Sequence, residues 1–447
     1  MNNMKVGMIS LGCDKNRVDA EVMLGLLKRG GFTIVNQAEE ADIIIVNTCG
    51  FIDPAKEESI DAIVEQAQYK SRGSCKLLIV TGCLAQRYSD QLISEIPEID
   101  AVVGTGKYTE ILQVIKRCLK GGTGLVNMGS PKLPCLKDVP RVLTTPSYTA
   151  YLKISEGCSN CCSYCVIPQL RGRHTSRPMD EVLAEAQQLV ENGVREIILV
   201  GQDLTRYGQD LGRGLSLAKL LGELVRLPRL TWLRLLYCYP DRVTDELIDI
   251  IGREDKICNY LDIPLQHINP LILKRMNRHF SPAEIRKLIA KLRERIPRVV
   301  LRTSFIVGFP GEGEEEFREL LDFVEEIRFD RLGVFAYSRE EGTPAAVYTD
   351  QINEDTKERR KAAIMDIQRR ISKKLNRQRV GQSYQVLIEG IQANNIYVGR
   401  SYGEAPEIDQ HIYVISEKPL KAGEFVEVRI TKAYDYDLLG ETYESSK

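Results

Sequence analysis

Twelve cysteines carry the clearest potential for chemistry in this 447-residue sequence, and four of them lie within eight residues, CSNCCSYC at 158–165. Cys158, Cys162 and Cys165 match the spacing CxxxCxxC. Cys161 cannot begin a second such triplet, because its last position would be Pro168. Four thiolates saturate a structural zinc or an ordinary cubane cluster, whereas three leave one iron open to a substrate or cofactor. The octet therefore predicts an iron–sulfur site with one free position, and Cys161 as a spare.

Three further cysteines share one position relative to predicted strands. Cys13, Cys49 and Cys83 each follow an apolar run, in KVGMISL, ADIIIVNT and KLLIVTG respectively. Ligands of open α/β sheets gather beyond the carboxyl ends of the strands, so these loops could bring three thiolates together. The alternative is that each cysteine is a small buried hydrophobe, the usual fate of a lone cysteine. Spacing alone leaves both interpretations open.

The elements that must position these cysteines follow a regular rhythm. Residues 4–140 and 150–350 alternate short apolar runs with helical patterns, which predicts parallel sheets covered by helices. The second stretch holds six such units and suits a full or partial (β/α)6 barrel of the TIM type, whose chemistry lies at the carboxyl ends of its strands. Strand-like segments after residue 381 predict a small all-β barrel. The expected domains are 1–140, 141–378 and 379–447.

The cysteine octet resembles the radical S-adenosylmethionine (SAM) enzymes, because CxxxCxxC follows the first barrel strand and has Tyr164 before its last cysteine. The resemblance implies a 4Fe-4S cluster on these three cysteines, with SAM at the open iron. VGQD at 200–203 is similar to the segment that binds the methionine amine, and SFIVGFPGE at 304–312 to the segment against the adenine. The implied SAM contacts are Tyr164, Gly201, Gln202, Asp203, Arg302, Ser304 and Gly308.

A narrower resemblance covers the whole chain. SLGCDKNRVDAE, NTCGFIDPAKEES and TGCLAQRY are similar to segments of the methylthiotransferases, which implies a second 4Fe-4S cluster on Cys13, Cys49 and Cys83 and a carboxy-terminal TRAM barrel. LGCDKNRVD is closer to the RimO type, which modifies an aspartate of small-subunit ribosomal protein twelve, than to the MiaB type, which modifies an adenosine of transfer RNA. Gly201 and Cys161 depart from the RimO pattern, where alanine and arginine are expected.

The implied reaction consumes two SAM molecules. One methylates a sulfur from a sulfur donor, and the other yields a radical that takes a hydrogen from the β-carbon of the aspartate. It requires no protein general base, so no catalytic side chain is predicted. The expected partners are the ribosomal protein, an electron donor such as flavodoxin or ferredoxin, and a sulfur donor. The alternatives are transfer-RNA methylthiolation and a non-catalytic iron–sulfur redox protein.

Charge separates these alternatives. Residues 381–447 hold six Lys or Arg and eleven Asp or Glu, which favours docking of a basic protein over a polyanionic RNA. Docking-face candidates are Tyr402, Glu404, Glu407 and Asp409. The predicted helix 354–379 is basic, with ten Lys or Arg after residue 356, and is either a solvated face or an RNA contact. No apolar run is long enough to span a bilayer, so we expect a cytoplasmic protein without a membrane partner.

Overall fold

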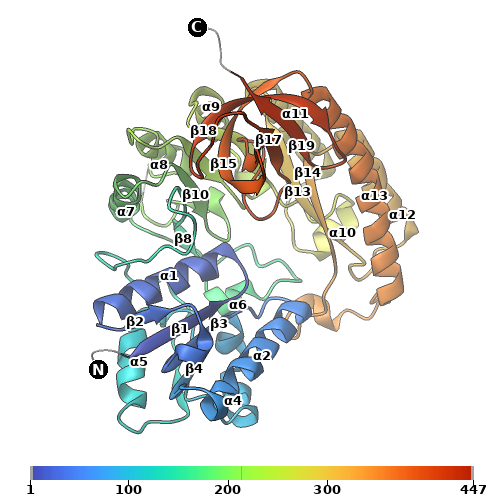
Figure 1. Ribbon diagram of the computed structural model, residues 1–447. Coiled ribbons are helices and arrows are strands. Elements are labelled where there is room, and N and C mark those ends of the chain that lie inside the picture. Colours follow the sequence, from blue (N-terminus) through green and yellow to red (C-terminus); the bar gives the residue numbers. More distant parts are fainter. Residues whose placement is uncertain (1–3, 213, 444–447) are drawn as a thin grey trace.

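Three units follow one another along the chain, each built on its own sheet (Figure 1). The computed structural model describes residues 4–212 and 214–443. The first unit holds a six-stranded parallel sheet, the second an open six-stranded parallel sheet, and the third a closed five-stranded barrel. The predicted fold class, two α/β units followed by a small all-β barrel, is confirmed.

The first sheet has the strand order β2-β1-β3-β4-β5-β6. Every residue of β3 and β4 is buried, as expected for parallel strands covered by helices on both faces. Its strands are β1 (Lys5–Ser10), β2 (Thr33–Val35), β3 (Ile43–Thr48), β4 (Leu77–Gly82), β5 (Ala101–Val103) and β6 (Leu125–Asn127). Its helices are α1 (Asp14–Arg29), α2 (Asp53–Ala67), α3 (Tyr69–Arg72), α4 (Cys83–Glu95) and α5 (Ile111–Cys118), with the short turns η1 (Ala38–Glu40) and η2 (Tyr108–Glu110).

The second sheet has the order β14-β13-β12-β11-β10-β7, so its first and last strands lie at opposite edges and the barrel is partial. Its strands are β7 (Thr149–Lys153), β10 (Glu196–Val200), β11 (Trp232–Leu235), β12 (Ile257–Asp262), β13 (Val300–Val307) and β14 (Arg331–Ala336), beside the ribbon β8 (Ser155–Glu156) and β9 (Thr175–Ser176). Its helices are α6 (Ile167–Arg171), α7 (Met179–Glu191), α8 (Leu217–Leu224), α9 (Asp245–Arg253), α10 (Pro270–Arg275), α11 (Pro282–Arg295) and α12 (Glu314–Ile327), with the turns η3 (Leu204–Arg206), η4 (Pro240–Arg242) and η5 (Pro344–Val347).

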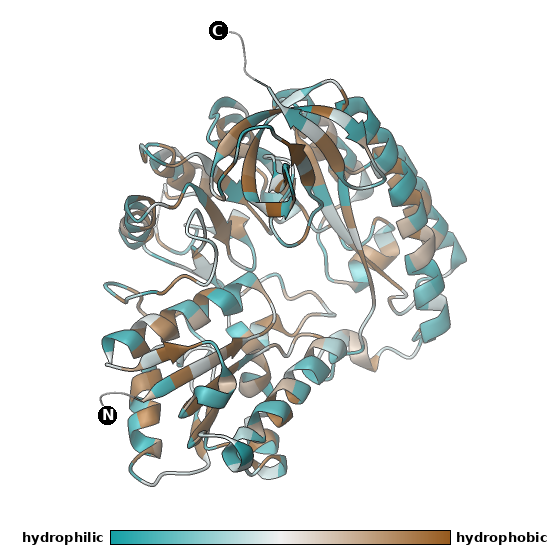
Figure 2. Ribbon diagram, in the orientation of Figure 1, coloured by the Kyte–Doolittle hydropathy of each residue, from teal (hydrophilic) through white to brown (hydrophobic). Residues whose placement is uncertain are grey.

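A long helix, α13 (Glu354–Arg379), leads from the second unit to the third. It lies along the outside of the partial barrel of the second unit, beside α12 (Figure 1). The closing barrel consists of β15 (Ser383–Ala393), β16 (Ile396–Arg400), β17 (Ile412–Ile415), β18 (Phe425–Ala433) and β19 (Leu438–Thr442). Apolar residues concentrate in the strands of all three units, whereas the helices are polar on their outer faces (Figure 2). Each unit therefore has a core of its own, with helices shielding the two parallel sheets.

Buried ion pairs fasten the closing barrel to the second unit. Glu196 of β10 accepts hydrogen bonds from Arg400 at 2.6 Å and Arg234 at 3.1 Å. Burial by itself would raise the pKa of Glu196, but the two arginines outweigh it and lower the pKa to about 2. A buried carboxylate is tolerated where it is paired and hydrogen-bonded in this way.

The predicted docking face is wrong for two of its four residues. Glu404 is buried and pairs with Arg331 at 2.8 Å and Arg379 at 2.6 Å. The side chain of Asp409 is only 3% exposed, and it accepts a hydrogen bond from Tyr260. The sequence showed their charge but not the cations and hydroxyl that face them inside the chain, so part of the acidic excess is neutralised internally.

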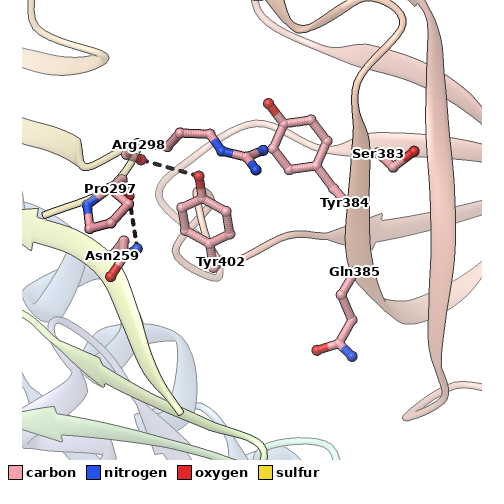
Figure 3. Close-up of a pocket in the computed structure, with 7 residues that line it drawn as sticks. All are labelled: Asn259, Pro297, Arg298, Ser383, Tyr384, Gln385 and Tyr402. Carbon is pink, nitrogen blue, oxygen red and sulfur yellow. Dashed lines mark hydrogen bonds between the residues drawn. The ribbon is translucent and has the colours of Figure 1, made fainter. Parts of the chain in front are cut away.

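The other two candidates also contact other parts of the chain. The Tyr402 hydroxyl donates to the Arg298 carbonyl at 3.1 Å and lines a small pocket between β15 and the start of β13 (Figure 3). This pocket lies beside the amino-terminal ends of the strands of the second unit. The chemistry of such barrels occurs at the opposite, carboxyl ends of the strands. Glu407 is exposed and pairs with Arg17 of α1 at 2.6 Å.

The basic residues of α13 are mostly paired as well. Eight of the ten Lys and Arg residues between 357 and 379 have a carboxylate within 4.0 Å: Lys357, Arg359, Arg360, Lys361, Arg369, Arg370, Lys373 and Arg379. This pairing leaves little unbalanced positive charge for an RNA phosphate.

Along 4–212 and 214–443, none of the helices combines the length and the apolar character that crossing a bilayer requires.

Candidate active site

The three separated cysteines lie at the carboxyl ends of neighbouring parallel strands. Cys13 precedes α1 after β1, Cys49 follows β3, and Cys83 begins α4 directly after β4. Because β1, β3 and β4 are adjacent in the sheet, the three loops open at one edge. A Cβ atom added to Gly12 would lie only 3.2 Å from the Cys49 sulfur, so the loop of Cys13 and the loop of Cys49 are in contact.

The thiols of Cys13 and Cys83 affect the ionisation of their neighbours in this group. Burial and the neighbouring Cys83 thiol raise the pKa of Cys49 to about 12, with a smaller contribution from Cys13. Burial also raises the pKa of Cys83, while Arg171 opposes the shift and Cys13 adds to it. Like charges that disfavour one another in this way indicate that the three sulfurs share one region.

The octet 158–165 forms a loop between β8 and α6. Burial raises the pKa of Cys158 to about 11, and the Cys162 thiol adds to the shift. Burial and the Cys162 and Cys158 thiols also raise the pKa of Cys165. Cys161 is exposed, with a positive φ of 52° and a carbonyl that accepts from Asn277. The three cysteines of the predicted triplet therefore lie together, and Cys161 points to another environment.

A buried arginine contacts the second triplet. Arg278 donates to the Cys162 sulfur at 3.7 Å and to the Tyr164 hydroxyl at 3.3 Å. It also stacks on Tyr239, with its guanidinium carbon 4.4 Å from the ring centre. Such a charge close to a thiolate stabilises the negative form of whatever the thiolate binds.

The segment VGQD lies beside the octet and leaves polar atoms without partners. A Cβ atom on Gly201 would lie 2.5 Å from the Ser155 hydroxyl, so glycine allows close packing there. Among the described residues, the Ser155 Oγ and the Gln202 Oε1 are buried without a hydrogen-bond partner. Gln202 Nε2 meanwhile donates to Glu156 at 2.7 Å. Two buried oxygens without partners, one next to Gly201 in space and one next to it in the chain, fit a ligand that brings hydrogen-bond donors, such as an amine.

Asp203 fixes this segment to the cysteine loop. One of its carboxylate oxygens accepts from Asn160 at 2.9 Å, and the other caps the turn η3 by accepting from the Thr205 backbone at 3.1 Å. Arg242 lies 3.4 Å from the same carboxylate. Asp203 therefore contacts the loop that carries the triplet, but its oxygens already have partners within the chain.

The later predicted contacts lie on and after β13. Arg302 pairs with Asp262 at 2.9 Å and lies 3.8 Å from Asp409 of the closing barrel. Ser304 is buried, and its backbone carbonyl accepts from Gln266. Gly308 has a positive φ of 69° and packs against Lys357, where a Cβ atom would clash. These residues share one strand and its end, but Arg302 already has a carboxylate partner.

Arg171 joins the two cysteine regions. It ends α6, six residues after Cys165, and its Nε donates to the Cys83 sulfur at 3.4 Å. Its remaining nitrogens bond Asn16, Asp19 at 2.7 Å and Glu156 at 3.1 Å. Glu156 in turn accepts from Gln202. One guanidinium thus contacts a cysteine of the first unit and, through one carboxylate, the segment VGQD of the second.

A buried lysine completes this network. Lys153 at the end of β7 is fully buried and contacts both Asp19 and Glu156, the latter at 2.7 Å. Burial by itself would raise the pKa of Glu156, but Arg171 and Lys153 outweigh it and lower the pKa to about 2. The two cations and two carboxylates balance in charge. The boundary between the first two units therefore holds a neutral network of buried, paired side chains.

The cysteine triplets do not form a site for a single metal ion. No three His, Cys, Asp or Glu side chains in the part of the chain that the structure describes converge closely enough for one. In a cubane cluster each thiolate binds a different iron, so the sulfurs stay further apart. The donor sets, three soft thiolates each, fit iron–sulfur clusters.

Sequence reasoning missed Arg171, Arg278 and Glu156, although each contacts a predicted site residue. No spacing pattern distinguishes a buried arginine from a surface one. The only available signal was proximity in the chain for two of them, since Glu156 and Arg171 flank the octet.

Comparison with known families divides the chain in the same order. Residues 5–104 match an uncharacterized protein family, UPF0004, residues 152–324 match the radical SAM superfamily, and residues 380–442 match the TRAM domain. The radical SAM match assigns an iron–sulfur cluster and SAM to the barrel. Fold and site thus define a radical SAM enzyme that carries a TRAM domain.

Relatives of nearly the same length narrow this class. The chain is 54% identical over 439 residues to the ribosomal protein uS12 methylthiotransferase RimO of Geotalea uraniireducens, covering 98% of both chains. It is 50% identical to the protein of that name from Clostridioides difficile, again over 98% of both. The chain belongs to the RimO family of methylthiotransferases, and these relatives favour neither transfer-RNA modification nor a non-catalytic redox protein.

Solved structures share the fold at low identity. The radical SAM methyltransferase TsrM from Kitasatospora setae, with cobalamin and a [4Fe-4S] cluster bound, superposes with a TM-score of 0.58 at 17% identity, covering 78% of this chain and 77% of that one. The cobalamin-dependent radical enzyme OxsB gives 0.54 at 13% identity, covering 82% of this chain and 56% of that one. These matches support the arrangement of an α/β unit before a radical SAM barrel.

Proposed function

We propose that this protein methylthiolates the β-carbon of an aspartate in small-subunit ribosomal protein twelve. The observation that carries the proposal is the 54% identity over 98% of the chain to a protein named for uS12 methylthiolation. The arrangement of the cysteines supports it. A methylthio transfer needs a sulfur-bearing site beside a radical site. Arg171, six residues after Cys165, contacts Cys83 at 3.4 Å and Glu156, just before the octet, at 3.1 Å.

Two 4Fe-4S clusters are part of the proposal. The first six-stranded unit, within residues 1–140, holds one on Cys13, Cys49 and Cys83. The barrel unit, 141–378, holds the other on Cys158, Cys162 and Cys165. The mutual effects of the thiols on their pKa values support both groupings. Each triplet leaves one iron without a protein thiolate, the position that a sulfur or a cofactor would occupy.

When bound, SAM and the clusters supply the radical chemistry and the methylthio group. The chain's own part is to bind, orient and exclude water. The buried Gln202 Oε1 suits the amine of SAM, and Gly201 keeps the segment close to Ser155. The further proposed contacts, in decreasing proximity to the octet along the chain, are Tyr164, Asp203, Arg302, Ser304 and Gly308.

Two partners follow from this chemistry. A reduced cluster needs a low-potential electron donor such as flavodoxin or ferredoxin, and the transferred sulfur needs a donor. The TRAM unit, 379–447, is proposed to dock the ribosomal protein. Contact of α13 with RNA stays a prediction, with little unpaired positive charge to support it.

The test is an anaerobic assay with reconstituted, reduced enzyme. Ribosomal protein twelve, assembled small subunits and transfer RNA are offered separately, and the products are weighed by mass spectrometry. We expect a methylthio increment on the ribosomal protein, free or in the subunit. An increment on transfer RNA alone would overturn the substrate, and no cleavage of SAM after reduction would overturn the enzyme.

Metal analysis supplies an independent check of the cluster count. The reconstituted protein is expected to hold about twice the iron and sulfide of one 4Fe-4S cluster per chain. Replacing all three of Cys13, Cys49 and Cys83 by alanine should halve this content. Replacing Cys135, an exposed cysteine outside both triplets, should not change it. Iron near one cluster in the unaltered protein contradicts the two-cluster proposal.

A further inference from the structure

Lys15 is buried without a carboxylate beside it. It lies in the first turn of α1, two residues after Cys13, and only 7% of its surface is exposed. Its ammonium group lies 3.5 Å from the centre of the Tyr237 ring. In the described parts of the chain, no Asp or Glu oxygen lies within 4.0 Å of it. Burial removes water from this ammonium, and the charged groups that face it, Asp14 and Cys13, form no salt bridge with it within 4.0 Å.

The other buried lysines show that this is an exception. Three lysine side chains are buried in the described part of the chain, and the remaining two are paired. Lys153 contacts Glu156 at 2.7 Å, and Lys357 contacts Glu354 at 2.6 Å. The chain therefore supplies a carboxylate wherever it buries a lysine for structural purposes, and supplies none at Lys15.

The two carboxylates that face Tyr237, Asp14 and Asp262, have other partners. Asp14 accepts a hydrogen bond from the Tyr237 hydroxyl at 3.1 Å. Asp262 accepts from Arg302 at 2.9 Å and from the Tyr237 backbone at 3.1 Å. Tyr237, through its ring face and its hydroxyl, is thus the main contact of the Lys15 ammonium within the chain. A cation–π contact holds a cation loosely enough to leave its hydrogen-bond donors for another group.

Lys15 lies where the first unit meets the carboxyl ends of the strands of the second unit. Tyr237 follows β11, at the carboxyl ends of the barrel strands where barrel chemistry occurs. Cys13, one of the proposed ligands of the first cluster, directly precedes α1. The first N–H groups of this 16-residue helix have no side-chain cap and add positive potential at the same point.

We infer that Lys15 binds the side-chain carboxylate of the target aspartate and makes the enzyme specific for it. The inference rests on the proposed function and deepens it by naming the group that recognises the substrate. The carboxylate takes the place of the missing anionic partner and accepts charge-assisted hydrogen bonds from the ammonium. Tyr237 positions the lysine, with its backbone held at a positive φ of 64° by bonds to Asp262 and Leu204.

The test measures binding, separately from turnover, with the reconstituted holoenzyme. Ribosomal protein twelve and its version with asparagine at the target position are titrated against wild-type, Lys15→Met and Lys28→Met enzymes, followed by fluorescence anisotropy. Wild-type enzyme is expected to bind the aspartate form about tenfold more tightly or better, the effect of one charged hydrogen bond. Lys15→Met should bind both forms alike, and Lys28→Met, altered at an exposed lysine of the same helix, should keep the preference.

Lys15→Arg and Lys15→Gln guard against a simple folding defect. Arginine keeps the charge and is expected to keep part of the preference, whereas glutamine should lose it, with iron content and thermal unfolding confirming that each variant is folded. A tenfold preference that survives in Lys15→Met or Lys15→Gln overturns the inference. Wild-type enzyme that methylthiolates the aspartate form without preferring it also overturns the inference alone, and wild-type enzyme that methylthiolates neither form overturns the proposed function.

Discussion

The two cysteine triplets differ in how the chain assembles them and in what their arginines do. One triplet lies on a single loop of eight residues, and the other is spread over three strand ends. Each has one cysteine in contact with a buried arginine, Cys162 with Arg278 at 3.7 Å and Cys83 with Arg171 at 3.4 Å. Arg278 belongs to the same unit as its cysteine, whereas Arg171 reaches across from the barrel into the first unit.

The two arginines also differ in how their positive charge is balanced, and therefore in the role we expect of each. Arg278 otherwise meets the Pro264 carbonyl and aromatic rings, so its charge is balanced mainly by the thiolate and the group bound there. Arg171 meets two carboxylates, Asp19 and Glu156, and much of its charge is already balanced. We therefore expect Arg278 to set an electronic property of its own site, and Arg171 to hold the two sites in fixed relation.

The largest expected effect comes from removing one cysteine from each triplet, which tests whether the two sites have different functions. Cys162→Ala should abolish SAM cleavage, because the proposed SAM site lies at its triplet. Cys49→Ala should spare part of the cleavage but stop methylthio transfer. Cleaved SAM is measured by chromatography of the reduced reaction, and transfer by mass spectrometry of the ribosomal protein. If both activities vanish in Cys49→Ala, the two sites are not separable in this way.

The next effect concerns Arg171. Arg171→Met leaves Asp19 and Glu156 buried with Lys153 as the single cation, and breaking a buried charge network costs about 3–5 kcal/mol. The free energy of unfolding in urea is expected to fall by about this amount, and less so for the exposed neighbour in Arg173→Met. Similar unfolding curves for the two variants contradict an assembling role for Arg171.

A smaller, electronic effect is expected from Arg278. Arg278→Gln removes a positive charge beside Cys162, so the reduced and more negative cluster becomes less favourable. A loss of about 1 kcal/mol corresponds to a midpoint potential about 40 mV more negative for a one-electron couple. An anaerobic titration followed by electron paramagnetic resonance measures this shift. An unchanged potential of the barrel cluster, or an equal shift of both clusters, refutes the local tuning.

The smallest effect is expected from Cys161. Cys161→Ala removes an exposed thiol outside the triplet and leaves the backbone carbonyl that accepts from Asn277 at 2.8 Å. Iron content and SAM cleavage should stay at the wild-type level, and both are measured on reconstituted protein. A variant that holds no barrel cluster shows that the triplet includes Cys161 and that the chosen register is wrong.

The sequence predicted the three-part fold because strand and helix periodicity is local. Spacing also predicts the triplet in 158–165, whereas the triplet of Cys13, Cys49 and Cys83 needed the resemblance to the methylthiotransferases as well. The apolar runs of β3 and β4, for example, are typical of parallel strands buried on both faces, and they are buried throughout. It failed at the docking face, where Glu404 and Asp409 have the composition of a surface loop but meet cations and a hydroxyl inside the chain. Composition reports charge and says nothing of which charges meet.

The sequence alone indicates the proposed ligands, because it shows which thiols are close in the chain and which follow a strand. The surroundings of those proposed ligands depend on the tertiary structure. Arg171 and Cys83 are 88 residues apart, and Lys15 and Tyr237 belong to different units, yet both pairs are in contact. The physical reason is that a buried charge is stabilised by whichever groups the packed units bring to it, and no local pattern in the chain encodes that meeting.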